Sequence, residues 1–273
     1  GAVFGMEVLA VGGMRYDALI PCLVAAIAGD LAVRLVGVHH VHYPVESGFP
    51  EISLQIVLLV AVAGVAFGLA SLLFSEATAA IEHVSKRYLP NPMLRTFTGG
   101  VFVIIITLAL GTRAYNGLSL PLLYECFTGA FIPTFAFLFK IILTAVTLGF
   151  GFKGGEVTPL FVIGATLGVT LSGPLGIPPA TLAALGFVAV FAAAANTPIA
   201  CVIMGAELFG GGGIILFGVA IFVAYTISGH RGIYHAQPVL VSKHLQPASS
   251  LIGSSLAQIR QQGSAWRLPR RRE

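Results

Sequence analysis

The sequence predicts an all-α polytopic membrane protein made of broken, tilted helices, and three observations lead to that class. Of the 273 residues, 56% are hydrophobic and 10% are charged. A soluble domain of this size carries about 25% charged residues, so a soluble fold is excluded. The mean hydropathy is +0.92. The apolar residues form runs separated by loop-like breaks, and several of these runs are short and interrupted by glycine.

Eight apolar segments are expected to be helical. They are Tyr16–Val38, Leu54–Ile81, Phe97–Gly111, Leu118–Ile142, Val157–Leu171, Thr181–Ala195, Pro198–Phe209 and Ile214–Ile227. Several are shorter than the ~20 residues that a perpendicular span needs. Helices that end inside a bilayer are tolerated only where they line a cavity or are buried in protein, so the pattern predicts broken helices around a pathway.

The distribution of positive charge predicts the orientation of these segments. Lysines and arginines gather in the loop 82–95 and in the arginine-rich end 267–272, and Arg15 precedes the first full segment. The segment Gly37–Glu51 has no lysine or arginine. The positive-inside rule therefore places Arg15, the loop 82–95 and the C-terminus in the cytoplasm. We expect a transmembrane domain over residues 1–240 and a polar, basic cytoplasmic tail over residues 241–273.

Several other site types are not expected. The three cysteines each stand alone in an apolar segment, which argues against a disulfide or metal site. They are Cys22, Cys126 and Cys201. A loop contains three histidines without further ligands, so we expect them to be solvated rather than bound to zinc. They are His39, His40 and His42. The run Gly210–Gly213 lacks the strand and the Lys-Ser/Thr of a nucleotide-binding loop. No cofactor, nucleic-acid partner or enzymatic reaction is expected.

The stretch Gly149–Gly168 is the most informative part of the chain. Glycines crowd its beginning, Glu156 follows them, and Pro159 lies at the start of a long apolar run. Between Gly154 and His230 the only formal charges are Glu156 and Glu207. A carboxylate in such apolar surroundings is costly and therefore a functional-site candidate. Backbone N–H groups of a glycine run and a helix N-terminus favour an anion, so an anion site at membrane depth is predicted.

A weak internal repeat joins the two ends of the sequence. Residues 1–12 resemble residues 201–212, with Gly5 matching Gly205 and Glu7 matching Glu207. Transporters are commonly built from paired repeats, with their sites where broken helices of both halves meet. If the repeat is real, this chain holds the end of the first repeat and the whole of the second.

Three patches in this order resemble the CLC family of anion channels and proton-coupled anion antiporters. They are Gly154–Pro159, the small-residue stretch Phe191–Pro198, and Gly232-Ile233-Tyr234. The resemblance covers residues 1 to about 240 and implies a partial CLC fold with inverted repeats. It also implies that Tyr234 is the central tyrosine that caps the anion site.

The run Gly155-Glu156-Val157-Thr158-Pro159 resembles the fluoride-exporting branch of bacterial CLC antiporters more than the chloride-type members, which have an aromatic residue where Val157 stands. The resemblance implies an anion site formed by Gly155, Glu156, Val157, Thr158 and Tyr234, with Glu156 as the proton-coupling residue. The chemistry fits, because hydroxyls and helix amides are strong donors to a small, strongly hydrated anion. Protonated Glu156 would donate to the anion and carry a proton.

The resemblance implies fluoride export coupled to protons (F⁻/H⁺ antiport), by a homodimer in the lipid bilayer of the bacterial inner membrane. Chloride transport, as a channel or as a Cl⁻/H⁺ antiporter, is the first alternative. An inactive, truncated fragment is another, because the family's first filter motif and gating glutamate precede the helix with which this chain begins. The proton-loading glutamate of chloride-type antiporters falls on Val8, beside Glu7, and fluoride-type members lack it.

The individual residues have structural alternatives. Glu156 is also explained as a carboxylate at a helix N-terminus. Thr158 is also explained as a helix cap. Tyr234 is also explained as an aromatic residue at the membrane interface, and Glu207 as a structural carboxylate near the membrane edge.

Overall fold

A computed structural model describes residues 1–37, 43, 45, 48–243 and 253–261. The helices in chain order are α1 (Ala2–Glu7), η1 (Tyr16–Ala18), α2 (Leu19–Leu35), α3 (Leu54–Tyr88), α4 (Pro92–Leu110), α5 (Leu120–Glu125), α6 (Ala136–Gly149), α7 (Val157–Leu175), α8 (Pro179–Ala195), α9 (Pro198–Phe209), η2 (Gly211–Gly213), α10 (Ile214–Ile227) and α11 (Leu256–Gln261). Extended pairing within the described ranges is limited to two isolated bridges, Val11 with Val239 and Pro238 with Ser255. The all-α prediction is confirmed.

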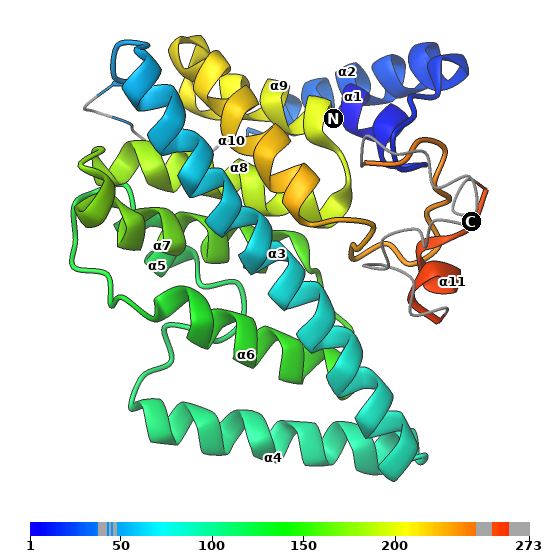
Figure 1. Ribbon diagram of the computed structural model, residues 1–273. Coiled ribbons are helices and arrows are strands. Elements are labelled where there is room, and N and C mark those ends of the chain that lie inside the picture. The colour runs from blue at the N-terminus through cyan, green and yellow to red at the C-terminus, as the bar shows by residue number, and fades with distance from the viewer. Residues whose placement is uncertain (38–42, 44, 46–47, 244–252, 262–273) are drawn as a thin grey trace, which may run out of the picture.

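Within the residues that the structure describes, four helical segments are long and apolar enough to cross a membrane: Tyr16–Leu35, Leu54–Tyr88, Pro92–Leu110 and Val157–Leu175. The apolar helices α6, α8, α9 and α10 are shorter, with 10 to 17 residues each. α3 has 35 residues and runs diagonally across the body (Figure 1). At ~1.5 Å per residue it exceeds the ~30 Å hydrocarbon core, so it is strongly tilted or extends beyond it.

The predicted boundaries agree with the structure at α9 and α10, whereas the single segment Leu118–Ile142 is wrong. That segment divides into α5 and the first half of α6, with residues 126–135 between them. Gly129 adopts a left-handed φ of 75° there, and Pro133 lacks the N–H that a continuing helix needs. Hydropathy missed the break because the connecting residues are themselves largely apolar.

The core lies where α7 and α8 pack against each other. All residues of α8 from Thr181 to Ala195 are buried. Gly164 of α7 faces Gly186 of α8, and a Cβ on either would overlap the backbone of the other helix. Such close approach through small residues is typical of helix pairs in membranes. α8 also contacts α3, α9 and α10, so it forms the buried centre from which the site residues are positioned.

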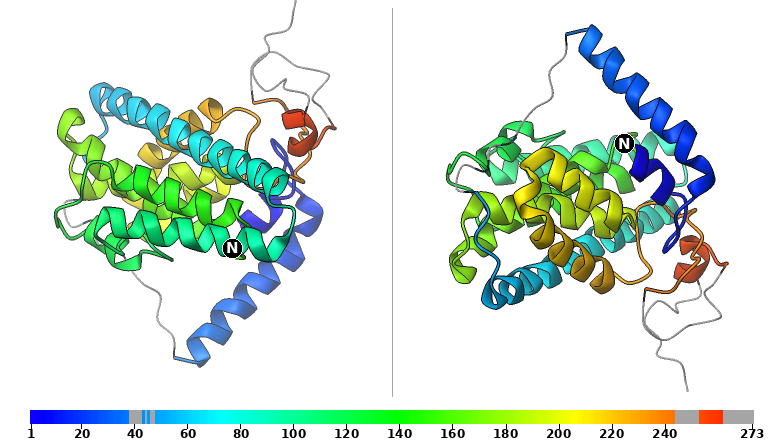
Figure 2. Two further views of the ribbon diagram at one scale, coloured as in Figure 1. Left: turned by 90° about the horizontal axis from the view of Figure 1, so that it is seen from below. Right: turned by 90° about the horizontal axis from the view of Figure 1, so that it is seen from above.

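α2 extends away from the body, as both views of Figure 2 show. None of its residues is buried, and Ile20, Val24, Ile27 and Leu31 are among its exposed apolar side chains. Within the described chain, α2 packs mainly against α1 and η1. An apolar helix exposed in this way requires lipid or another protein surface around it.

The described part of the C-terminal region folds back onto the beginning of the chain. Val239, Leu256 and Ile259 form a small buried cluster with Val11, and α11 lies beside the turn that follows α1 (Figure 2). The division of the chain at residue 240 stays a prediction, because most of 241–273 lies outside the described residues. The same holds for His39, His40 and His42 and for the terminal arginines.

Candidate functional site

The predicted anion-binding run lies at the N-terminus of α7. Glu156 occupies the N-cap position and makes no side-chain cap, while Val157 is the first residue of the helix. The Glu156 carbonyl accepts the first helical bond, from the N–H of Leu160, at 3.2 Å. Thr158 is the second helical residue, so its interpretation as the helix cap is wrong. The first-turn N–H groups of α7 have no acceptor inside the helix, which favours an anion at this end.

The side chains of Glu156 and Thr158 are free to bind. Both residues are partly buried. Among the described residues, neither the Glu156 carboxylate nor the Thr158 hydroxyl makes a hydrogen bond or ion pair. Buried polar groups in folded proteins are usually paired. Two unpaired polar side chains within the first turn of a helix are therefore candidates for binding a ligand.

Tyr234 is held in place by the end of α8. The N–H of Ile233 donates to the carbonyl of Ala194 at 2.9 Å. A Cβ on Gly232 would lie 2.6 Å from Asn196 Nδ2 and 2.7 Å from the Ala194 oxygen, so only glycine fits there. Tyr234 itself is partly buried and lines the same cavity as Val157, the first residue of α7. The structure thus brings Tyr234 to the N-terminal turn of α7, although Val157 is 77 positions earlier in the sequence.

A cavity of about 480 Å³ joins Val157 and Tyr234. Phe161 and Phe191 line it, with ring centroids 5.1 Å apart in an edge-on arrangement, and Glu207 lines it from α9. The positive edges of aromatic rings are compatible with a nearby anion. The sequence analysis missed both phenylalanines, although Phe161 lies one helical turn after Val157 and shares its face. Glu207 is exposed.

Gly155 does not line this cavity. It contributes, with Lys153 and Gly154, to a separate cavity of about 260 Å³ on the side of α4 and α6. Of the five predicted site residues, Gly155 therefore faces one cavity and Val157 and Tyr234 face the other, while Glu156 and Thr158 line neither of the two. α7 begins between them.

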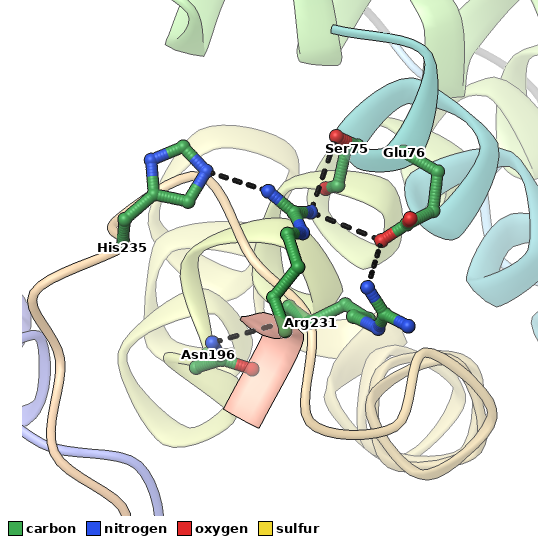
Figure 3. A network of polar contacts seen from close by, with 6 residues as sticks. Ser75, Glu76, Asn196, Arg231 and His235 are labelled. Atoms are coloured by element: carbon green, nitrogen blue, oxygen red, sulfur yellow. Dashed lines mark hydrogen bonds and ion pairs between the residues drawn. The ribbon is translucent and has the colours of Figure 1, made fainter. Parts of the chain in front are cut away.

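Arg231 and His235, which flank Tyr234 in the sequence, belong to a network of polar contacts with Glu76 of α3 (Figure 3). Arg231 Nη1 donates to Glu76 Oε1 at 2.7 Å, and Arg260 Nη2 donates to the same oxygen at 3.0 Å. Arg260 Nη1 lies 2.9 Å from His235 Nε2. Since Arg231 and His235 flank Tyr234, this cluster connects the tyrosine segment to α3 and α11. The sequence analysis missed this cluster, although Glu76, a carboxylate inside an apolar segment, could have indicated it.

Gln237 adds a buried amide to the same segment. Its Nε2 donates to the carbonyls of Val8 at 2.6 Å and of Ala195 at 3.0 Å. Its Oε1 accepts from Asn196 Nδ2 at 3.0 Å. These bonds join the ends of α1 and α8 to the chain just after Tyr234, so the tyrosine has support on both sides.

The side chain of Glu7, the last residue of α1, lies at the N-terminus of α9. Its side chain is buried, and its two carboxylate oxygens accept from the N–H groups of Ile199 at 3.0 Å and Ala200 at 2.7 Å. Glu207, its partner in the sequence repeat, is exposed and lines the cavity. The two glutamates thus have different surroundings despite their matching positions.

Comparisons with known proteins identify the family of this chain. The family model described as "Voltage gated chloride channel" matches residues 1–229. The chain is 47% identical over 253 residues to a chloride/fluoride channel protein of Pseudomonas syringae pv. tomato, covering 90% of this chain and 56% of the relative. It is 24% identical over 212 residues to an uncharacterized protein of Methanocaldococcus jannaschii, covering 77% and 53%.

Two solved structures are also similar to this chain. The crystal structure of a CLC-type fluoride/proton antiporter matches with a TM-score of 0.80 and 33% identity, covering 83% of this chain and 57% of that one. A eukaryotic CLC transporter, 19% identical, shares the fold with a TM-score of 0.60, covering 83% and 39%. The chain spans about half the length of the curated relatives it matches. From the family match over residues 1–229, the chain belongs to the voltage gated chloride channel (CLC) family of membrane anion transport proteins.

Proposed function

We propose that this chain forms part of the anion pathway of a transporter that exports fluoride in exchange for protons. The observation that carries the proposal is Glu156 at the N-cap of α7, with its carboxylate unbonded within the described chain, directly before Val157, which shares a cavity with Tyr234. The relatives named chloride/fluoride channel protein and fluoride/proton antiporter support the same substrate class.

The chemistry assigns one role to each group. The first-turn amides of α7, the Thr158 hydroxyl and the Tyr234 hydroxyl donate to the anion and replace its lost water. Ionised Glu156 repels an anion, whereas protonated Glu156 is neutral and donates to it. Alternation between these two forms couples proton movement to anion movement. Glu7 is not the proton carrier in this proposal, because both of its oxygens already accept backbone hydrogen bonds.

The test uses the product of the complete open reading frame, reconstituted in liposomes and followed with a fluoride electrode and a pH-sensitive dye. We expect fluoride efflux with opposite proton movement. Glu156→Gln should abolish proton movement, because an amide carries no titratable proton. Glu125→Gln is the matched control, since Glu125 is exposed on α5 away from both cavities. Efflux of chloride in preference to fluoride would contradict the fluoride assignment.

We further propose a two-fold homodimer in the bacterial inner membrane, with the C-terminus in the cytoplasm. The support is the exposed apolar surface of α2, continued by Ile199 and Ile203 of α9 and by Ile214 and Ile215 of α10. Symmetric dimers with one self-complementary interface are the commonest oligomers. The mass of the detergent-solubilised protein from light scattering tests this, and a monomeric mass at micromolar concentration would contradict it.

A further inference from the structure

The smaller cavity, of about 260 Å³, has a lining unlike that of the Tyr234 cavity. It is bounded by α4, α6, the turn around Asn116, and residues 153–155 before α7, and it shares no lining residue with the larger cavity. Its polar lining includes Lys140, Thr144 and Lys153 and contains no aspartate or glutamate. Two cations without a carboxylate give this space a positive electrostatic potential.

Lys140 is a buried cation held only by neutral groups. It is 1% exposed. Its Nζ donates to the carbonyls of Tyr115 at 3.0 Å and Gly117 at 2.6 Å and to Ser119 Oγ at 2.8 Å. No carboxylate within the described ranges forms an ion pair with it. These dipoles fix the ammonium without cancelling its charge. Burial of an uncompensated charge is costly, and an ionisable residue in a membrane helix is by default a sign of function.

Thr144 presents an unpaired hydroxyl to the same cavity. It lies one helical turn after Lys140 and is 8% exposed. Thr107 and Thr147, which lie in α4 and α6, bond to the carbonyl four residues earlier at 2.7 Å each. Thr144 makes no hydrogen bond with any group of the described chain. The residue as a whole is more than nine-tenths buried, and its hydroxyl is therefore a donor without an acceptor at a residue that lines this cavity.

Residues 153–155 complete the lining from the side of α7. Lys153, Gly154 and Gly155 are exposed toward open space, and a Cβ built on Gly155 would meet no atom within 4 Å. The volume holds several water molecules, each of which takes ~30 Å³ in the liquid. Such a space suits a small, partly hydrated anion, and Val103, Leu143 and Leu148 make part of the lining apolar.

We propose that this cavity is a second anion-binding site, in which a halide lies against the Thr144 hydroxyl and the backbone of Gly154 and Gly155, in the field of Lys140 and Lys153. The choice of halide rests on the proposed function. Because Gly155 belongs to this cavity and Val157 to the Tyr234 cavity, the N-terminus of α7 lies between the two sites. An anion passing that helix end is then attracted from one side by fixed lysines and on the other meets Glu156 and Tyr234.

The test is equilibrium binding of NaF and NaCl to the purified chain in detergent, by titration calorimetry. We expect two classes of site. Thr144→Val keeps the side-chain volume, and Lys153→Gln keeps most of the side-chain length. Each variant should weaken the binding class of the smaller cavity by about tenfold, which is the effect of losing one interaction with a charged group. Thr158→Val should weaken the other class alone. The controls are Thr96→Val, at a partly buried position of α4 that lines neither of the two cavities, and Lys86→Gln near the end of α3. Lys140 is left intact because its three bonds also support the fold.

The position of the site is tested separately by anomalous diffraction from crystals soaked in bromide. A peak beside Thr144 in the wild type that is lost in Thr144→Val supports the proposal. Unchanged binding in both variants, or bromide only at Tyr234, overturns it. Failure of the proposed function is distinguishable, because liposomes would then show no proton-coupled flux while the Thr144-dependent binding class remained.

Discussion

The carboxylate of Glu7 accepts a hydrogen bond of 2.7 Å from the backbone N–H of Ala200, which lies 193 residues later in the chain. With the parallel bond from Ile199, it places a negative charge at the N-terminus of α9. Such a charge is stabilised by the unpaired amides and dipole of the helix end. α1 and α9 are thereby joined next to the cavity that contains Tyr234.

Replacement of Glu7 by alanine should destabilise the protein. The change leaves the buried N–H of Ala200 and the partly buried N–H of Ile199 without an acceptor. A buried group left unpaired costs about 1–3 kcal/mol. Glu7→Gln, which retains one oxygen, should cost less. The measurement is the thermal midpoint in detergent. Glu51→Gln, at an exposed position, serves as control. An unchanged midpoint in Glu7→Ala would contradict the capping role.

The pair Arg231–Glu76 should show measurable energetic coupling. Its side chains are 14% and 41% exposed, so solvent screens the interaction only in part. We expect a coupling free energy near the upper end of the ~0.2–1 kcal/mol found for exposed pairs. A double-mutant cycle of Arg231→Gln and Glu76→Gln measures it. The more exposed pair Lys86–Glu82 within α3 is the matched comparison and should give a smaller value.

The free energy of unfolding should decrease when the pH falls below about 6.5, the ordinary pKa of histidine. Burial by the surrounding chain, and then the charge of Arg260, lower the pKa of His235, while Glu82 and Glu76 act in the opposite direction and Lys86 adds to the lowering. The folded state therefore favours neutral His235, whose Nε2 then accepts from Arg260. This stability is fully present above the unfolded pKa of about 6.5 and is lost as the pH falls through the lowered folded pKa.

Thermal midpoints between pH 8 and pH 5 (roughly the range in which histidines titrate) check this prediction. The wild type should lose stability toward acid relative to His235→Gln, because the variant has no imidazole to protonate. Parallel curves for the two proteins would show that His235 does not contribute.

The contact between α7 and α8 should tolerate no added side-chain volume. Gly186→Ala would place a methyl group on the backbone of Gly164 and on the ring of Phe67. Overpacking of this kind costs about 1–3 kcal/mol, or more where backbone must move. The matched control is Gly173→Ala in the same pair of helices, where a Cβ meets nothing within 4 Å. That variant should be neutral or gain up to ~1 kcal/mol from helix propensity. Equal effects at both positions would contradict the packing argument.

Gly232→Ala should impair the Tyr234 site more than overall stability. The new methyl group would overlap Asn196 and the Ala194 carbonyl, and the segment that carries Tyr234 would move away from α7. We expect anion binding at Tyr234 to weaken by about tenfold or more, as when a hydrogen bond to a charged group is lost. Binding that depends on Thr144 should be retained. Titration calorimetry of Gly232→Ala, compared with Thr158→Val and Thr144→Val, shows which of the two binding classes is weakened.

The sequence by itself determined the membrane class, most helix positions and the residues at the start of α7. Composition excludes a soluble fold, because too few charged residues remain to cover a surface. Proline and glycine marked the limits of α9 and α10, and the isolation of Glu156 in apolar sequence marked it as a site residue. These conclusions depend on local chemistry and on the cost of charge in an apolar environment.

Only the tertiary structure decided how distant residues combine. Glu7 and Ala200, Glu76 and Arg260, and Lys140 and the turn at Gly117 meet because helices far apart in the chain pack side by side. No local pattern records those partners, since hydrophobic periodicity specifies which face of a helix is buried but not against which other element. For the same reason, sequence analysis grouped Gly155 with Tyr234, whereas the fold directs them into two different cavities on opposite sides of one helix end.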